Sequence, residues 1–162
     1  MLIISPTARI SKFTDIEDSV RGTRIIIEDN VTIDSFVRIK PVGGSGDVRI
    51  GRDSVINSGT VIFSGNGVDI GESVLIAPHC TIVPVNHAYK KPETLIRQQG
   101  FLPSKGGIRI ERDVWIGANC VLLDGAYLRE SCVIGAGSVV GGEVAPYSIN
   151  VGNPLRCIGY RE

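Results

Sequence analysis

The sequence IERDVWIGANCVLLDGAYLRESCVIGAGSVV, from Ile110 to Val140, has a large aliphatic residue at every sixth position. These residues are Ile110, Ile116, Leu122, Leu128, Ile134 and Val140. A period of six fits neither an amphipathic helix, whose period is 3.6, nor a half-exposed strand, whose period is two. It is typical of a repeat fold in which each six-residue unit supplies one short strand and one turn.

The same period extends toward the N-terminus, with phase breaks that mark insertions. The aliphatic positions there are Ile10, Ile16, Ile27, Ile33, Ile39, Ile50, Ile56, Ile62, Ile70, Ile76 and Ile82. Four residues after most of these aliphatics there is a small or β-branched residue, as at Val31, Ser54, Cys80, Cys120 and Ser138. Two positions in every six are therefore predicted to face inward.

Three such units close one turn of a triangular coil, so the sequence predicts an all-β, parallel β-helix rod. Glycine often follows the aliphatic residue, as at Gly51 and Gly117, and we expect it where the chain bends tightly at a corner. A β-sandwich is the alternative, but it would show period-two alternation with turns every 8 to 12 residues. We expect one β-helix domain over residues 1–154, followed by a C-terminal tail of residues 155–162.

Composition restricts the classes of partner. The chain has 162 residues with 17 basic and 17 acidic side chains, and it has no basic run, which argues against nucleic-acid binding. No stretch approaches the roughly 18 apolar residues of a membrane span, and the N-terminus does not resemble a signal peptide, so we expect a cytoplasmic protein. Cys80, Cys120 and Cys132 fall at the small inward position without metal-ligand spacing, which predicts packed thiols, no disulfide and no metal.

One long insertion interrupts the repeat. Ile82 and Ile110 lie 28 residues apart where the repeat allows six, which predicts an extruded loop at about residues 86–107. The stretch VPVNHAYKKP, from Val83 to Pro92, opens this loop and contains His87, one of only two histidines. Polar side chains of the loop, among them Arg97, suit contacts with a polar ligand, and a solvated loop is the alternative.

Several motifs carry a resemblance to a known family. They are the hexads IGESVL, IAPHCT, IGANCV and IGAGSV, the NHAY stretch from Asn86 to Tyr89, DVWIGA from Asp113 to Ala118, and VGNPLR from Val151 to Arg156. Over residues 48–160 the chain resembles the hexapeptide-repeat acyltransferases, most closely the galactoside and maltose O-acetyltransferases and the sugar acetyltransferases of polysaccharide synthesis. The resemblance implies a left-handed β-helix, a homotrimer and acetyl-CoA as the acyl donor.

The resemblance also implies roles for individual residues. His87 corresponds to the general base, and the backbone N–H of Ala118 corresponds to the donor that stabilises the oxyanion. The expected coenzyme A contacts are Trp115, Ala118, Ala136, Ser138 and Arg156, and the expected acceptor contacts are Asn57, Asn86, Tyr89 and Arg97. Acidic residues that follow the acceptor-binding asparagine in the galactoside branch are absent here, which predicts a different acceptor. For a lone histidine such as His87, a structural role is the alternative.

We therefore expect an acetyltransferase that uses acetyl-CoA, needs no metal and acetylates a hydroxyl or amino group of a sugar or glycan precursor by direct attack. Apolar residues at outward positions predict self-association as a homotrimer. They are Val55, Val61, Leu75, Trp115, Val121 and Val133. The alternatives are a non-catalytic hexapeptide-repeat scaffold and a γ-class carbonic anhydrase, whose zinc takes three histidines where this chain has two.

Overall fold

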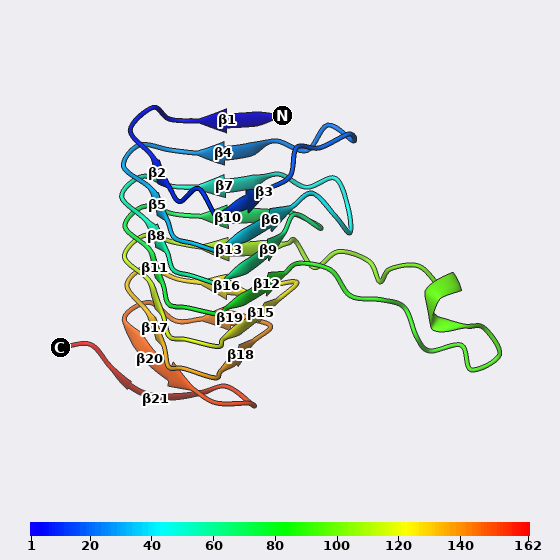
Figure 1. The fold of residues 1–162 in the computed structure, drawn as a ribbon. Coiled ribbons are helices and arrows are strands. Elements are labelled where there is room, and N and C mark those ends of the chain that lie inside the picture. Colours follow the sequence, from blue (N-terminus) through cyan, green and yellow to red (C-terminus); the bar gives the residue numbers. More distant parts are fainter.

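The computed structural model describes residues 1–162, which wind into a left-handed parallel β-helix with three sheets along the faces of a triangular rod (Figure 1). The first sheet contains β1 (Leu2–Ile4), β4 (Ile25–Ile27), β7 (Val48–Ile50), β10 (Val68–Ile70), β13 (Ile108–Ile110), β16 (Tyr127–Leu128) and β19 (Glu143–Val144). The second contains β2 (Arg9–Ile10), β5 (Thr32–Ile33), β8 (Val55–Ile56), β11 (Leu75–Ile76), β14 (Trp115–Ile116), β17 (Val133–Ile134), β20 (Ser148–Val151) and β21 (Arg156–Tyr160). The third contains β3 (Asp15–Ile16), β6 (Arg38–Lys40), β9 (Val61–Phe63), β12 (Thr81–Val83), β15 (Val121–Leu123) and β18 (Val139–Val140).

Each coil of the rod takes one strand from each sheet, so β1–β3 form coil 1 and β10–β12 form coil 4. Neighbouring coils pair in parallel with the predicted aliphatic residues in register, as for Ile56, Ile76 and Ile116. Coils are stacked at the usual strand spacing of about 4.8 Å. Because identical positions of successive coils lie above one another, the period of six in the sequence becomes columns of side chains along the rod.

The inward columns form a single continuous core, as predicted. Val31, Cys80, Cys120 and their equivalents are fully buried together with the aliphatic residues. Ile10 and Ile16 are only half-buried, because they belong to coil 1 and no further coil covers them. Each parallel strand is too short to be stable alone, so burial between coils provides the stability of the rod.

The backbone at the corners differs from the prediction that the glycine after each aliphatic residue makes the tight bend. The residue with positive φ is not the glycine after the aliphatic residue but the one two positions later, such as Asp53 (φ 60°) or Asn119 (φ 57°). Gly51 and Gly117 are needed for another reason. A Cβ atom at Gly51 would lie 2.5 Å from the carbonyl oxygen of Gly71, and one at Gly117 would lie 2.6 Å from the backbone nitrogen of Ala136. Glycine therefore allows successive coils to approach each other.

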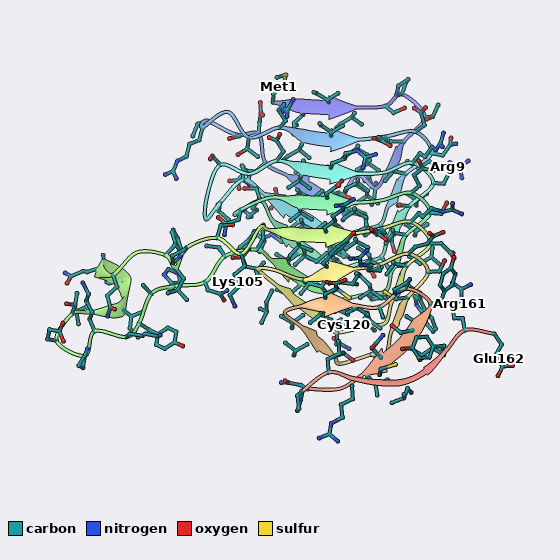
Figure 2. All side chains as sticks on the ribbon, turned by 180° about the vertical axis from the view of Figure 1, so that it is seen from behind. Met1, Arg9, Lys105, Cys120, Arg161 and Glu162 are labelled. Carbon is teal, nitrogen blue, oxygen red and sulfur yellow. The ribbon has the colours of Figure 1, made fainter.

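The C-terminal residues add a strand to the rod. After the turn that holds the cis Asn153–Pro154 peptide bond, β21 runs antiparallel to β20 and covers the last coil. The Arg161 side chain, labelled near the C-terminus in Figure 2, donates hydrogen bonds to Asp113 (2.9 Å) and to the carbonyl oxygen of Ser131 (3.2 Å). A segment that the hexad pattern could describe only as a tail is thus attached to the β-helix.

None of the helical segments in the structure has the length and apolar character of a membrane span. The helical content is one short 3-10 turn, η1 (Ile96–Gln98), in the long loop.

Candidate functional site

The long loop leaves the rod after β12 and returns before β13, and it projects away from the coils (Figure 1). Its two arms pair near the rod. The N–H of Ala88 donates to the carbonyl oxygen of Gly100 (3.0 Å), and that of Leu102 donates to Asn86 (2.8 Å). This pairing places His87 directly opposite Phe101. The histidine therefore lies on a fixed base of the loop, whereas Arg97 lies in η1 at the exposed tip.

The His87 imidazole is exposed and tilts against the Phe101 ring, with centroids 4.8 Å apart and an interplanar angle of 41°. Within this chain neither ring nitrogen takes part in a hydrogen bond or an ion pair. A neutral imidazole can accept a proton from an attacking group, and both nitrogens of His87 are open to a ligand.

A hollow of about 440 Å³ lies beside this histidine. Its lining consists of Asn86, His87, Tyr89, Leu102, Lys105, Leu123, Asp124 and Gly141. The structure thus brings together three of the residues predicted for the site, Asn86, His87 and Tyr89. The predicted residues Asn57, Arg97, Trp115, Ala118, Ala136, Ser138 and Arg156 do not line this hollow of a single chain.

Asp124 is the residue of this region that the sequence analysis missed. It is buried, and its carboxylate accepts hydrogen bonds from the N–H of Lys105 (2.8 Å), the N–H of Gly107 (2.9 Å) and the side-chain amide of Asn66 (3.2 Å). Figure 2 labels Lys105 where the loop rejoins the rod. Asp124 therefore fastens the returning arm of the loop. The available signal was a carboxylate within an otherwise apolar stretch, in the hexad LLDGAY.

The corner between the second and third sheets carries two of the predicted donor-binding positions. The N–H groups of Ala118 and Ala136 donate to no other group of the chain, so both are open to a ligand. The Ser138 side chain is not open, because its hydroxyl donates to the carbonyl oxygen of Gly135 (2.6 Å) and accepts from the N–H of Gly152 (2.9 Å). Asn57 points back to the rod and donates to the carbonyl oxygen of Ile76 (2.8 Å).

Trp115 and Arg156 are exposed. Trp115 stands outward on β14 in register between Leu75 and Val133, which gives the second sheet an apolar outer column. Arg156 begins β21 and has no acidic partner within ion-pair distance. An aromatic surface and an unpaired guanidinium are groups that can contact the base and the phosphates of a nucleotide.

The buried thiols offer no nucleophile. Burial raises the pKa of Cys132 to about 12. Interaction with the neighbouring Cys120 thiol, together with burial, raises the pKa of the Cys80 thiol. The same interaction acts in the opposite direction on Cys120 and lowers its pKa. The Cys120 thiol nevertheless donates to the carbonyl oxygen of Gly135 (3.2 Å), which requires its proton, and it lies in the core.

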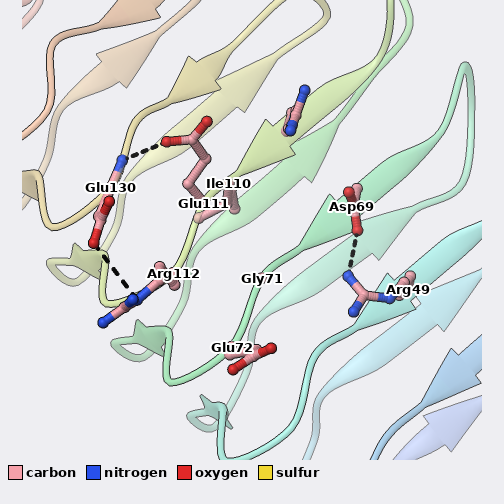
Figure 3. Close-up of a pocket in the computed structure, with 9 residues that line it drawn as sticks. Arg49, Asp69, Gly71, Glu72, Ile110, Glu111, Arg112 and Glu130 are labelled. Atoms are coloured by element: carbon pink, nitrogen blue, oxygen red, sulfur yellow. Dashed lines mark hydrogen bonds and ion pairs between the residues drawn. The ribbon is translucent and has the colours of Figure 1, made fainter.

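A second hollow, of about 420 Å³, lies on the first sheet and is lined mainly by charged side chains (Figure 3). These charges pair with one another. Arg49 contacts Asp69 (2.9 Å) and Arg112 contacts Glu130 (3.6 Å). The hydrogen bond from Tyr127 holds the pKa of the Glu111 carboxyl below its usual range, so Glu111 is a poor base near neutral pH.

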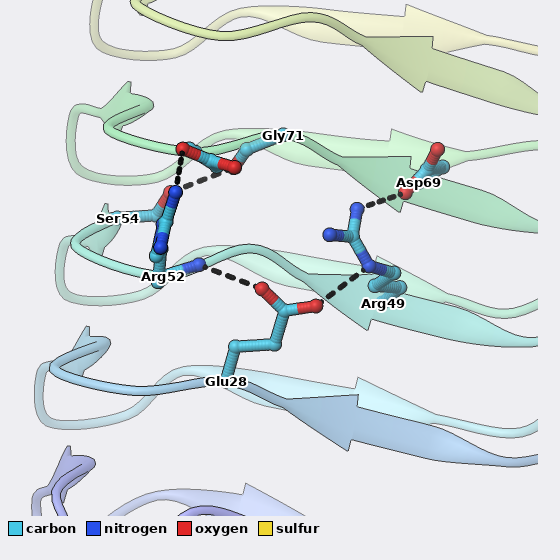
Figure 4. Close-up of polar contacts among 7 residues, drawn as sticks. Glu28, Arg49, Arg52, Ser54, Asp69 and Gly71 are labelled. Carbon is cyan, nitrogen blue, oxygen red and sulfur yellow. Dashed lines mark hydrogen bonds and ion pairs between the residues drawn. The ribbon is translucent and has the colours of Figure 1, made fainter.

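The pairing continues along the same sheet, where Glu28 accepts from the Arg49 guanidinium (2.8 Å) and from the N–H of Arg52 (3.1 Å), as Figure 4 shows. Arg52 in turn contacts Glu72 (3.0 Å). Exposed pairs of this kind contribute about 0–1 kcal/mol each. We interpret this face as a solvent-exposed charge ladder rather than a catalytic site. No group of three or more histidine, cysteine and acidic side chains is placed to hold a metal ion.

Comparisons with known proteins agree with the fold. A family model described as "Bacterial transferase hexapeptide (six repeats)" matches residues 107–142. A probable acetyltransferase of Mycobacterium tuberculosis is 34% identical over 117 residues, which is 72% of this chain and 38% of that protein. The galactoside O-acetyltransferase of Escherichia coli is 34% identical over 112 residues, which is 69% of this chain and 53% of the enzyme. The chain thus spans about half or less of the length of these relatives.

Among solved structures, a mutant of AntD, an N-acyltransferase from Bacillus cereus, superposes with a TM-score of 0.83 at 26% identity. The match covers 98% of this chain and 83% of AntD. That structure contains dTDP-4-amino-4,6-dideoxyglucose and coenzyme A.

Proposed function

We propose that this chain, whose residues 107–142 match the hexapeptide-repeat family of bacterial transferases, transfers an acetyl group from acetyl-CoA to a hydroxyl or amino group of a sugar. The observation that carries this proposal is the position of the His87 side chain. Its imidazole is held at the base of the loop, has both nitrogens free and borders a hollow with Asn86 and Tyr89.

In the proposed reaction His87 accepts the proton of the acceptor's hydroxyl or amino group as the oxygen or nitrogen attacks the thioester carbon. The free N–H of Ala118 donates to the oxyanion that forms. When the carbon–sulfur bond breaks, the imidazolium returns the proton to the leaving thiolate. The proposed transfer is direct, because no cysteine or serine lies in a nucleophile motif and Cys80 and Cys120 are buried.

The donor site that we propose uses groups from the second sheet and from the C-terminal strand. Trp115, the free N–H groups of Ala118 and Ala136, and the backbone near Ser138 contact coenzyme A, and Arg156 contacts a phosphate. His87 and these groups line no common hollow of one chain. We therefore propose a homotrimer in which the loop of one subunit meets the donor site of its neighbour, with Asn57 and Arg97 at the acceptor.

The test is the release of coenzyme A thiol from acetyl-CoA with a panel of free sugars, amino sugars, sugar phosphates and nucleotide sugars. The expected result is acceptor-dependent thiol release with at least one member, together with a product heavier by one acetyl group in mass spectrometry. Absence of both coenzyme A binding and thiol release across the panel would contradict an enzyme and support the non-catalytic scaffold.

A further inference from the structure

The side chain of Phe101 lies against the His87 imidazole. The isolated antiparallel bridge between the two arms of the loop places these residues opposite each other. Their ring centroids are 4.8 Å apart, with an interplanar angle of 41°. Tilted aromatic rings at this separation attract each other, because the positive edge of one ring meets the electron-rich face of the other. The contact therefore favours one orientation of the imidazole.

No polar group of the chain holds the imidazole in place. His87 is exposed, and neither of its ring nitrogens has a hydrogen-bond partner in the chain. An exposed side chain without such a partner exchanges among its staggered rotamers. A hydrogen bond would restrict this exchange, but it would occupy one of the two nitrogens. Contact with a phenyl ring restricts it and leaves both nitrogens open to a ligand.

The loop itself fixes the position of Phe101. The two backbone hydrogen bonds that join the arms of the loop lie on either side of the ring pair. Further out, the side-chain amide of Gln99 donates to the carbonyl oxygens of Lys91 (2.9 Å) and Thr94 (2.7 Å), and its oxygen accepts the N–H of Lys91 (3.1 Å). The hairpin is thus closed at two levels by its own residues, and Phe101 is held against His87 within the loop.

Packing within the chain does not account for a phenyl ring at position 101. Phe101 is 50% exposed, lies outside the hydrophobic core and does not line the hollow beside His87. The backbone bonds of the hairpin do not depend on which side chain stands there. A large apolar side chain that remains half in water stabilises the fold little, so the ring calls for another explanation.

The proposed reaction supplies that explanation. Proton transfer requires an imidazole nitrogen within hydrogen-bond reach of the attacking group, and a small displacement of a catalytic group lowers the rate strongly. When the imidazole accepts the proton it becomes a cation, and a cation within about 6 Å of an aromatic ring centroid is attracted to the ring. The contact with Phe101 thus holds the base before proton transfer and is retained after it.

We propose, on the basis of the function above, that Phe101 is the positioning residue of the general base. Its ring keeps the His87 imidazole turned toward the hollow and leaves both nitrogens free. Phe101 itself contacts neither the acetyl donor nor the acceptor.

Nuclear magnetic resonance of the assembled protein tests the contact without requiring turnover. The chain has only two histidines, so selective labelling gives two sets of imidazole signals, which His87→Ala and His79→Ala assign. The ring current of Phe101 should displace the His87 signals, and in Phe101→Leu they should move toward those of an exposed histidine. The His79 signals should not move.

Steady-state kinetics, with the acceptor identified by the thiol-release panel, test the role. In Phe101→Leu kcat should fall about fivefold to tenfold, because loss of an aromatic contact lowers the population of correctly oriented imidazole by that factor. The KM values for acetyl-CoA and for the acceptor should stay unchanged, as should the melting temperature and the sedimentation coefficient. Phe101→Tyr retains an aromatic ring and should keep kcat near the wild type.

Phe13→Leu is the matched control. Phe13 is similarly exposed (56%) and stacks on Phe36 with ring centroids 5.8 Å apart, but it lies in coil 1. The same substitution there should change neither kcat nor the His87 signals.

Several results would overturn the positioning role. They are wild-type kcat in Phe101→Leu, His87 signals that do not move in this variant, or a raised KM for the acceptor with unchanged kcat, which would make Phe101 an acceptor contact. Dissociation of Phe101→Leu into smaller species would instead make the ring a subunit contact.

The two proposals fail in different ways. A wild type that acetylates a sugar no faster than Phe101→Leu does would overturn only the role of Phe101. A wild type that transfers no acetyl group to any member of the panel would overturn the acetyltransferase and the positioning role together, whatever the His87 signals show.

Discussion

The two histidines of the chain have opposite environments. His79 lies at a corner with a φ of 60°, and its ring fills the space above Gly59, where a Cβ atom would come within 2.3 Å of the imidazole. His87 lies on the loop with an open imidazole. Position and motif single out His87 in the sequence, and the packing of His79 over Gly59 agrees with a structural role for the second histidine.

His87→Ala should lower kcat by about 10²- to 10⁴-fold, which is the contribution of a positioned general base. Coenzyme A affinity and the melting temperature should be near wild type, because the core does not include this side chain. Steady-state kinetics with a saturating acceptor, together with thermal denaturation, provide the measurement. His79→Ala is the matched control and should keep most of the turnover. More than about a tenth of wild-type kcat in His87→Ala would rule out the general base.

Asp124→Asn should loosen the loop. The side-chain amide keeps one acceptor oxygen but turns an NH₂ group toward backbone donors, so at least one of the hydrogen bonds from Lys105 and Gly107 is lost. Faster amide hydrogen exchange at these two residues and a lower kcat with unchanged coenzyme A affinity are expected. Asp53→Asn is the control, because Asp53 is exposed at a corner, and it should change neither the amide exchange at Lys105 and Gly107 nor kcat. Unaltered exchange in the Asp124 variant would show that the carboxylate does not hold the loop.

At the scale of elements, the repeat predicted where strands and corners fall, because each hexad is a local unit with the same inward positions. The repeat predicted that the glycines after the aliphatic residues are needed for tight bends at the corners, and this reason was wrong. The relevant contact at Gly51 is with Gly71 of the next coil, and no local turn preference reveals a contact between coils. The strand β21 was missed for the same reason, since its pairing is antiparallel and lies outside the repeat.

The attachment of β21 should depend on pH. Hydrogen bonds from Ser131 and then Arg161 lower the pKa of Asp113. A carboxyl whose folded pKa is lowered contributes stability above its unfolded pKa, and this contribution is lost as the pH falls through the folded value. The amides of β21 should therefore lose protection from hydrogen exchange, relative to the amides of the core, as the pH falls into the acid range.

Arg161→Ala should speed exchange at β21 already at neutral pH and weaken its dependence on pH, because the Asp113 carboxylate loses one of its partners. Arg129→Ala, which removes an ion pair with Glu143, is the control and should leave β21 unchanged. If amide exchange at β21 is the same in Arg161→Ala and in the wild type at every pH, Arg161 does not attach β21 to the rod.

At the scale of the whole molecule, the outer face of the second sheet is the feature that a single rod leaves unexplained. Val55, Leu75, Trp115 and Val133 stand in register along it, and Leu75 and Trp115 are 48% and 53% exposed. An apolar column of this length on a monomer is unfavourable in water, whereas contact with a neighbouring subunit would bury it.

Leu75→Lys should therefore dissociate the proposed trimer, because a subunit contact would have to bury an unpaired ammonium group. Sedimentation velocity at micromolar concentration should show a trimer for the wild type and smaller species for this variant. Val20→Lys makes the same chemical change at a residue that is 98% exposed, and it should leave the assembly intact. A wild-type protein that sediments as a monomer would contradict both the trimer and the shared site.

The sequence by itself determined the rod, the inward columns and the loop that carries His87, because these depend on which residue type recurs at which position in a local repeat. The tertiary structure decided how positions far apart in the chain meet. It brought the Asp124 carboxylate to the returning arm of the loop, stacked Phe13 on Phe36 and joined Arg161 to Asp113. Such contacts depend on the length of each insertion and on the register between coils, and a periodic pattern does not encode which side chains the register places side by side.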